Sequence, residues 1–330
     1  MENNTQMPLL EFLPVSIFGA VMGLSGLSFA WRLAAKLWPM NFNASEGIGA
    51  IAILLFLVLL VSFMMKFRRY PLLLSKELAH PVGVSFYGTF IISLVLIPGL
   101  LLPYFPGLAT VIWCIAAVAM LLFAWFVLRK WLDHQQLPEN AMPVWVIPIV
   151  GTLDVPIVGI HLPVYGIHEI CMVFYGIGLI FAFILLILIF SRLLFQVPVP
   201  QAVQPTLLVL ASPLALAFTG YENLTGVQDL FATVLFYFNL FLLALLASKI
   251  MLLPKVCPFY VSWWSVSFPL SAVTIAAFLY AEHRPGIVHQ VIAGLLLATT
   301  TAVIIFLGIQ TLYRIFKGTF SSLTIPQPTK

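Results

Sequence analysis

The sequence predicts an all-α integral membrane protein with ten transmembrane helices. Hydrophobic residues make up 62% of the 330 residues and charged residues only 8%, and the mean hydropathy is +1.10. A soluble domain carries about a quarter charged residues. Ten apolar segments, each near the ~20 residues that a helix needs to cross a bilayer, follow one another along the chain. They run over about 14–37, 47–67, 81–104, 107–129, 143–162, 166–191, 205–221, 226–250, 258–281 and 287–313.

The odd-numbered segments share a pattern that the even-numbered segments lack. Proline suits a first helical turn, because its missing N–H would have no partner there. The odd-numbered segments open with Pro14, Pro81, Pro143, Pro205 and Pro258. A second weak point follows within each of them, at Gly23, Gly88, Gly151, Pro213 and Pro269.

This repeat predicts five hairpins of one odd and one even helix, related by rotation about an axis normal to the membrane. The interrupted odd helices would lie inside. The uniformly apolar second and sixth segments would face lipid. The alternative is that prolines at helix starts and glycines within helices are simply common in membrane proteins.

The ninth segment shows the interruption most clearly. No charged residue lies between Lys255 and Glu282, yet Pro269 stands near the middle, directly after Phe268. Proline removes a backbone donor and clashes with the preceding turn, and a broken helix in a bilayer is tolerated only against protein or a water-filled cavity. The segment therefore indicates a pore-facing helix with Phe268 at the break. The alternative is a phenylalanine in ordinary core or lipid contact.

The distribution of lysine and arginine predicts the topology. Twelve of these residues fall on the side that holds both termini, and Arg32, Lys36 and Arg284 fall on the other. Because basic residues concentrate on the cytoplasmic side, we expect both termini to be cytoplasmic in an inner or plasma membrane protein. Residues 1–318 would form one ten-helix channel domain, and 319–330 a short polar cytoplasmic tail.

Two features of the odd segments allow two interpretations each. Asp154 is a charged residue inside the fifth segment, where buried charge often marks an ion or proton pathway. It is a candidate proton-coupling or gating group, or it caps a helix that restarts at Pro156. Gly19, Gly23 and Gly26 form a small face on the first segment. They would either widen a pore or allow close helix packing.

Other chemistry has little support in the sequence. His161, His168, His283 and His289 fall near the predicted external side, where they could titrate with external pH or be ordinary solvated loop residues. Their spacing and the three cysteines match no common metal-ligand pattern. Because nucleotide-binding and hydrolase motifs are absent, we expect no enzyme activity, no cofactor, no metal and no nucleic-acid partner.

Three features of the sequence resemble one known family. They are the first segment, L-P-V-S-I-F-G-A-V-M-G-L-S-G-L-S-F-A-W (Leu13–Trp31), the ninth, F-Y-V-S-W-W-S-V-S-F-P-L-S-A (Phe259–Ala272), and the bend positions Pro148 and Pro213. The family is that of the tellurite-resistance and dicarboxylate transporters, which includes bacterial TehA and the plant guard-cell slow anion channel.

The resemblance implies five helical hairpins in quasi-fivefold symmetry around a central pore, assembled as a homotrimer with one pore in each protomer. It implies that Phe268 is the gate that occludes the pore and that Gly19 faces it. An ionised Asp154 exposed to this pore would repel anions. The candidate pore-lining residues are Gly19, Gly23, Gly88, Gly151, Pro148, Pro213 and Pro269.

The function we expect is therefore a gated channel for small anions, embedded in the lipid bilayer. The alternative is a secondary carrier for C4-dicarboxylates or oxyanions such as malate, sulfite or tellurite, with or without proton coupling through Asp154. A third interpretation is a membrane-embedded sensor or scaffold that conducts nothing.

Overall fold

The computed structural model describes residues 13–39, 44–255 and 257–319, and every regular element in these ranges is helical. Most of the expected tail at 319–330 lies outside the described residues. Five long helices are uninterrupted and are called the outer helices. They are α2 (Ser45–Arg69), α5 (Pro106–Asp133), α8 (Ile167–Phe195), α10 (Leu230–Ile250) and α12 (Ile287–Phe316).

The odd-numbered segments, called the inner segments, all begin as 3₁₀-helix and continue as α-helix. The first joins η1 (Val15–Phe18) to α1 (Gly19–Leu37), and the third joins η2 (Gly83–Phe86) to α4 (Tyr87–Leu101). The seventh joins η6 (Gln201–Ala211) to α9 (Ser212–Thr225), and the ninth joins η8 (Val261–Val266) to α11 (Ser267–His283). The fifth alternates through η4 (Pro143–Val146), α6 (Ile147–Val150), η5 (Gly151–Leu153) and α7 (Asp154–Gly159).

Three prolines mark the junctions between the two kinds of helix. Pro148 and Pro213 are the second residues of α6 and α9, and Pro269 is the third residue of α11. The first backbone N–H groups of an α-helix have no intrahelical acceptor, so a proline there sacrifices no hydrogen bond. The expected break in the ninth segment is therefore a change of helix type rather than a gap.

Nine helical segments of the described chain are long and apolar enough to cross a membrane. The fifth inner segment, Pro143–Gly159, is apolar but shorter. The protein is thus an all-helical, multi-pass membrane protein whose segments agree closely with those expected. Three short helices were not expected: η3 (Pro138–Asn140), η7 (Leu253–Lys255) and α3 (Pro71–Ala79), which follows α2 and has no fully buried residue.

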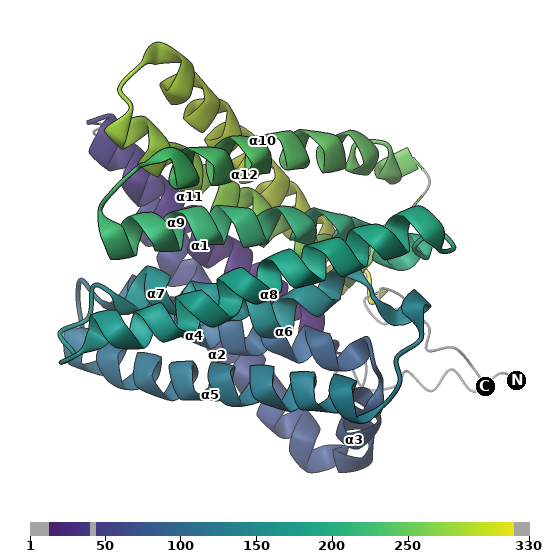
Figure 1. Ribbon diagram of the computed structural model, residues 1–330. Coiled ribbons are helices and arrows are strands. Elements are labelled where there is room, and N and C mark those ends of the chain that lie inside the picture. Colours follow the sequence, from purple (N-terminus) through teal and green to yellow (C-terminus); the bar gives the residue numbers. More distant parts are fainter. Residues whose placement is uncertain (1–12, 40–43, 256, 320–330) are drawn as a thin grey trace, which may run out of the picture.

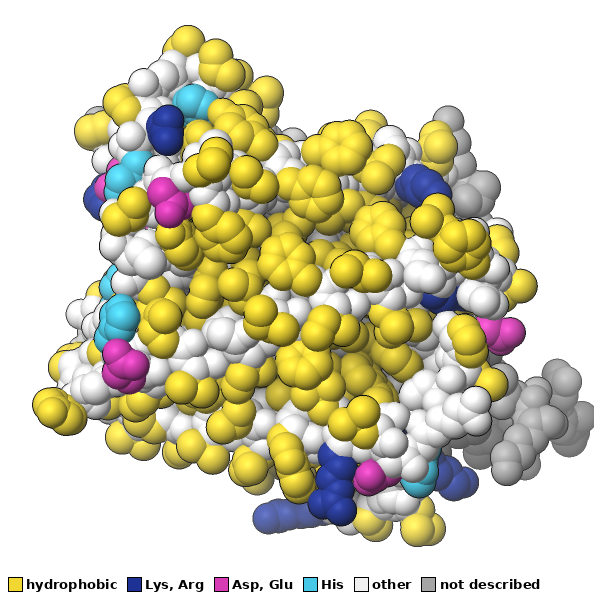
Figure 2. Space-filling view, viewed as in Figure 1, with side chains coloured by type: hydrophobic (Ala, Val, Ile, Leu, Met, Phe, Trp, Pro, Cys, Tyr) yellow, Lys and Arg dark blue, Asp and Glu magenta, His cyan; other side chains and the backbone are white. Residues whose placement is uncertain are grey.

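Inner and outer helices differ in burial as the repeat predicts. In the four longer inner segments, 61–89% of the most apolar stretch is buried inside the protein, against 28–39% in the outer helices. Figure 1 shows α5, α8 and α10 running nearly parallel across the outside of the bundle. Figure 2 shows the same face covered by apolar side chains, with charged residues gathered toward its edges. The outer surface therefore suits contact with lipid.

The inner segments form a closed ring in chain order. Each packs against the next, through α1 with α4, α4 with α7, α7 with α9 and α9 with α11. The ring closes because α11 also packs against α1.

The contact between α1 and α11 is unusually close. The hydroxyl of Ser267 donates a hydrogen bond to the carbonyl oxygen of Gly19 (3.1 Å), and that of Ser271 to the carbonyl oxygen of Gly23 (3.1 Å). A Cβ atom at Gly23 would lie only 2.2 Å from the Ser267 Oγ. Glycine at this position lets the two backbones approach, so the close-packing interpretation holds for Gly23.

Candidate functional site

The ring of inner segments encloses two cavities. The first has an empty volume of about 560 Å³, which includes space open to solvent. Its wall contains residues from all five inner segments and, within the described chain, none from an outer helix. These residues are Ser16, Gly19, Met22, Phe86, Thr89, Ile92, Val146, Ile147, Val150, Gly151, Asp154, Val209, Ser212, Leu216, Val261, Ser262, Trp264, Ser265, Phe268 and Pro269.

The second cavity has an empty volume of about 270 Å³, which again includes space open to solvent. It lies further along the same segments and is lined by all five of them. Its lining residues are Gly26, Phe29, Leu96, Asp154, Ile157, Leu216, Thr219, Phe268, Ala272 and Ile275. Asp154, Leu216 and Phe268 belong to both walls. These three side chains therefore lie where the two cavities meet.

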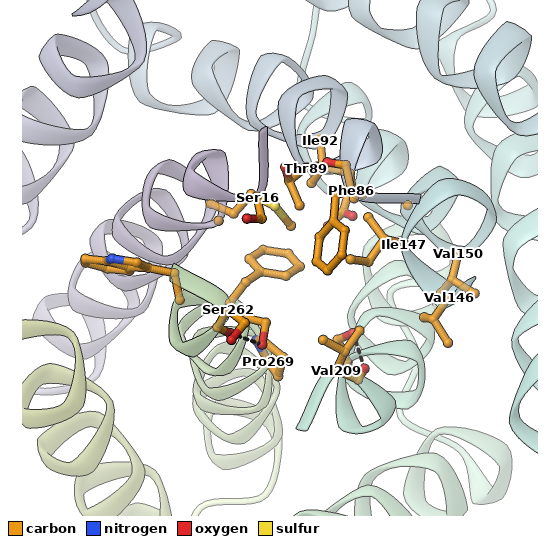
Figure 3. A pocket seen from close by; sticks show the side chains of 18 of the residues that line it. Ser16, Phe86, Thr89, Ile92, Val146, Ile147, Val150, Val209, Ser262 and Pro269 are labelled. Carbon is orange, nitrogen blue, oxygen red and sulfur yellow. Dashed lines mark hydrogen bonds between the residues drawn. The ribbon is translucent and has the colours of Figure 1, made fainter. Parts of the chain in front are cut away.

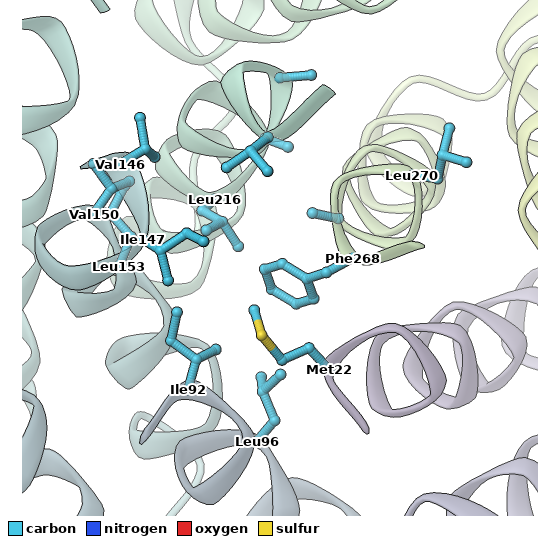
Figure 4. Close-up of a cluster of buried hydrophobic side chains, with 14 of the residues drawn as sticks. Met22, Ile92, Leu96, Val146, Ile147, Val150, Leu153, Leu216, Phe268 and Leu270 are labelled. Atoms are coloured by element: carbon cyan, nitrogen blue, oxygen red, sulfur yellow. The ribbon is translucent and has the colours of Figure 1, made fainter. Parts of the chain in front are cut away.

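Phe268 occupies the centre of this boundary. Its side chain is only 6% exposed, and Figure 4 shows the ring pointing from α11 toward Met22, Leu216 and Ile92 on three other inner segments. Leu270 lies on the opposite side of the same helix (Figure 4). Phe268 takes this place because Ser267 anchors the start of α11 to α1, which turns the next residue toward the ring axis.

Apart from Asp154, the described wall of the first cavity carries hydroxyl groups but no ionisable side chain. The hydroxyl of Thr89 donates to the carbonyl of Phe86 (2.7 Å), that of Ser212 to Val209 (2.7 Å), and that of Ser265 to Ser262 (2.6 Å). These bonds satisfy carbonyl groups near the 3₁₀ junctions and occupy the hydroxyl protons. Figure 3 shows the Phe86 ring projecting into the space between the segments. Apart from Asp154, the wall therefore presents apolar groups and hydroxyl groups.

Asp154 is fully buried and, among the residues that the structure describes, has neither a counter-ion nor a hydrogen-bond partner. Its relative exposure is 0%, and both carboxyl oxygens lack a partner within the described residues. Asp154 is the first residue of α7, but its side chain accepts no hydrogen bond from the helix N-terminus. The capping interpretation of Asp154 is therefore wrong, and the carboxyl group faces the two cavities.

Some of the other candidate residues line the cavities, and others contact neighbouring helices. Gly19, Gly151 and Pro269 line the first cavity. Pro148 and Pro213 are in neither set of lining residues.

The remaining glycines make helix contacts. A Cβ atom at Gly88 would lie 2.7 Å from Ile147 Cγ2, and one at Gly23 would collide with Ser267. The atoms nearest to a Cβ at Gly19 belong to Trp264, whereas a Cβ at Gly26 would lie 3.7 Å from the Phe268 ring. The nearest atom to a Cβ at Gly26 is Ser271 Cβ, at 2.6 Å, so Gly26 also allows close packing of α1 against α11.

Several wall residues were missed by sequence reasoning, although a signal was available. Each inner segment contributes positions three or four residues apart, as a helix face requires. On the first segment the stripe is Ser16, Gly19 and Met22, and on the third it includes Phe86, Thr89 and Ile92. A step of three residues from Gly19 would have identified Met22, whereas Phe86 lies only two residues from Gly88 and could not be found in this way.

The histidines lie apart from the cavities. His283 Nδ1 is 2.9 Å from Glu222 Oε1, His168 contacts the carbonyl of Leu224 (3.1 Å), and His289 contacts the hydroxyl of Tyr237 (3.2 Å). Among the residues that the structure describes, no group of three or more His, Cys, Asp or Glu side chains could hold a metal ion.

Comparison with known proteins assigns the chain to a family. The family model for the voltage-dependent anion channel (SLAC1) matches residues 13–312. The guard cell S-type anion channel SLAC1 of Arabidopsis thaliana is 25% identical over 322 residues, which cover 94% of this chain and 57% of the relative.

Two further relatives agree. The S-type anion channel SLAH3 of Arabidopsis thaliana is 23% identical over 330 residues, covering 96% of this chain and 50% of the relative. The chain thus spans about half the length of these plant proteins. The tellurite resistance protein TehA homolog of Haemophilus influenzae is 24% identical over 321 residues, covering 93% and 92% of the two chains. Because the family model matches nearly the whole chain, this multi-pass membrane protein belongs to the SLAC1/TehA voltage-dependent anion channel family, whose members are channels and transporters rather than enzymes.

Proposed function

We propose that this protein is a gated channel for small anions, with its pore formed by the five inner segments and closed by the Phe268 side chain. The observation that carries the proposal is that Phe268 borders two cavities, both lined by all five inner segments. If the ring rotates away, the two cavities join into one path along the bundle. Anions then move down their electrochemical gradient.

Anion preference in this proposal does not come from a ring of fixed cations, because the described cavity walls contain no lysine or arginine. Arg32, near the far end of α1, is engaged with Glu46 (3.2 Å) and the carbonyl of Gly99 (2.8 Å). Apart from Asp154, the walls offer apolar groups and weak dipoles. We therefore expect weakly hydrated anions to permeate best, since they lose water at the smallest cost.

The closed ring of inner segments supports quasi-fivefold symmetry of five hairpins, in which the shorter fifth segment completes a tenth span. We place both termini in the cytoplasm of a cell inner or plasma membrane, as the twelve-to-three distribution of basic residues favours. We further propose a homotrimer with one pore in each protomer. The proposed ligands are small anions, with no nucleic acid, cofactor or metal.

The channel is tested by anion-substitution recordings from the purified protein in planar bilayers. We expect the Phe268→Ala variant to carry larger anion currents than the unmodified protein, because it removes the ring between the cavities. Leu270→Ala is the matched control, since it shortens a buried side chain on the opposite side of the same helix. Currents in Phe268→Ala no larger than those of the control would refute the gate.

A secondary carrier for dicarboxylates or oxyanions is the second candidate, and the buried carboxyl group of Asp154 is the observation that favours it. In this mechanism Asp154 binds the coupled proton. Uptake into liposomes would then depend on a pH gradient and saturate with substrate, and Asp154→Asn would abolish the dependence on the gradient. Flux that is indifferent to the gradient excludes proton coupling.

A further inference from the structure

The junction between the two cavities contains a single group that can carry charge. Among the described residues that line either cavity, Asp154 is the only one with an ionisable side chain. It belongs to both walls, as Phe268 does. Any ion that moves from one cavity to the other must therefore pass this carboxyl group.

No described residue around Asp154 offsets its charge. Both of its oxygens are buried without a hydrogen bond among the described residues. The lining residues from the other four inner segments at this level are uncharged and do not titrate: Met22, Gly26, Ile92, Leu96, Leu216, Thr219, Phe268 and Ala272.

The charged groups at the end of the bundle form pairs outside both cavity walls. Glu222 of α9 is buried and lies 2.9 Å from His283 through Oε1, while its Oε2 has no partner among the described residues. The ammonium group of Lys36 lies 2.6 Å from Glu282 Oε1, and Arg32 pairs with Glu46. Neither pair belongs to a cavity wall. The field that an ion meets at the constriction is therefore set mainly by Asp154.

A charge in such a place acts strongly on a passing ion. Electrostatic interactions are less attenuated in a protein interior than in bulk water, and no counter-ion among the described residues shields the carboxylate. An ionised Asp154 repels an anion in either cavity and attracts a cation. A neutral Asp154 does neither.

We propose that Asp154 determines the charge selectivity of the pore: anions pass when its carboxyl group is neutral, and an ionised carboxylate turns the preference toward cations. This inference rests on the proposed channel function and deepens it. It assigns to Asp154 a role in selectivity, whereas the carrier alternative assigns it a transported proton.

The experiment uses the full-length protein in planar bilayers with the Phe268→Ala substitution as background, so that the pore is open. Reversal potentials under a salt gradient give the ratio of anion to cation permeability between about pH 5 and pH 8, the range in which buried carboxyl groups can titrate. We expect the ratio in the background variant to fall as the pH rises. Asp154→Asn, which is nearly isosteric, should raise the ratio at high pH by about tenfold or more and remove its pH dependence.

Glu282→Gln is the matched control, because it removes a carboxylate that lies outside both cavity walls. We expect it to leave the permeability ratio within about twofold of the background, since an exposed charge is screened by salt. If Asp154→Asn does not fold, the pH series on the background variant alone decides the question.

The outcomes separate the two proposals. Currents whose selectivity is the same with Asp154 and Asn at all pH values would overturn the assignment but leave the channel intact. A constant ratio across the pH series would do the same. A Phe268→Ala protein that carries no current refutes the channel itself, and the role of Asp154 falls with it.

Discussion

The contact between α1 and α11 can be tested by replacing Gly23 with alanine. On an exposed helical site this change stabilises a helix by up to about 1 kcal/mol. Here the added methyl group would lie 2.2 Å from Ser267 Oγ and 2.5 Å from Ser267 Cβ. Both distances are far shorter than the ~3.5 Å or more that carbon atoms in contact require. A change of rotamer at Ser267 would move its Oγ but not its Cβ, so α1 and α11 must move apart.

This separation has a cost that can be estimated. Overpacking a well-packed interior costs about 1–3 kcal/mol. Separating the helices also weakens the hydrogen bond from Ser267 to Gly19, and such a bond contributes about 1 kcal/mol. After allowance for the helix propensity of alanine, we expect Gly23→Ala to lower the free energy of unfolding by about 1–3 kcal/mol. A fall in Tm by a few degrees should follow.

The assay is thermal unfolding of the purified protein in detergent, with Gly176→Ala as the matched control. Gly176 is also in a long helix, α8, but a methyl group added there would meet no neighbouring atom within 4 Å, so this variant should be as stable as the unmodified protein or slightly more stable. The double variant Gly23→Ala/Ser267→Gly should recover part of the loss, because it removes the colliding atoms. Equal Tm values for Gly23→Ala and Gly176→Ala would refute the described packing.

Two further predictions concern the end of the bundle near α3. Lys66→Met should lower Tm by several degrees in the same assay, because Lys66 is buried and donates to Glu77 Oε1 (3.0 Å) and the carbonyl of Leu13 (2.9 Å); an unchanged Tm would contradict this. Burial lowers the pKa of His80, whose Nδ1 accepts hydrogen bonds from the backbone of Val82 and Gly83. The neutral ring therefore contributes stability above its unfolded pKa of about 6.5 that is lost as the pH falls through the lower folded pKa. His80→Asn should make Tm less sensitive to acid, and an identical pH profile would count against this role.

The sequence predicted best those features that depend on composition and periodicity within a single segment. Apolar segments of spanning length cannot be soluble loops, so their positions could be read directly. The prolines and glycines of the odd segments also indicated which helices are interior, because interrupted backbone is tolerated only against protein or a cavity. Phe268 stood out for the same reason, since it adjoins the proline of the most interrupted segment.

Other features depended on neighbours that the sequence does not reveal. A side chain at Gly23 or Gly88 would collide with Ser267 or Ile147. The sequences of the first and third segments do not identify these partners. Phe86 lines the first cavity only because a 3₁₀ turn precedes α4 and sets its direction. The isolation of Asp154 was equally hidden, because the following proline suggested a helix cap. The helix α3 was missed because it is short and contains the charged residues Lys76 and Glu77.

The central claim is that the side chain at position 268 closes a path between two cavities. The most direct measurement is the unitary anion conductance of a graded series at this position, Phe268→Leu, Phe268→Val and Phe268→Ala, beside Leu270→Val and Leu270→Ala. If the claim is right, conductance rises stepwise as the side chain at 268 becomes smaller and does not change in the 270 series. Conductance that is independent of side-chain size at 268, or that rises equally in both series, would contradict it.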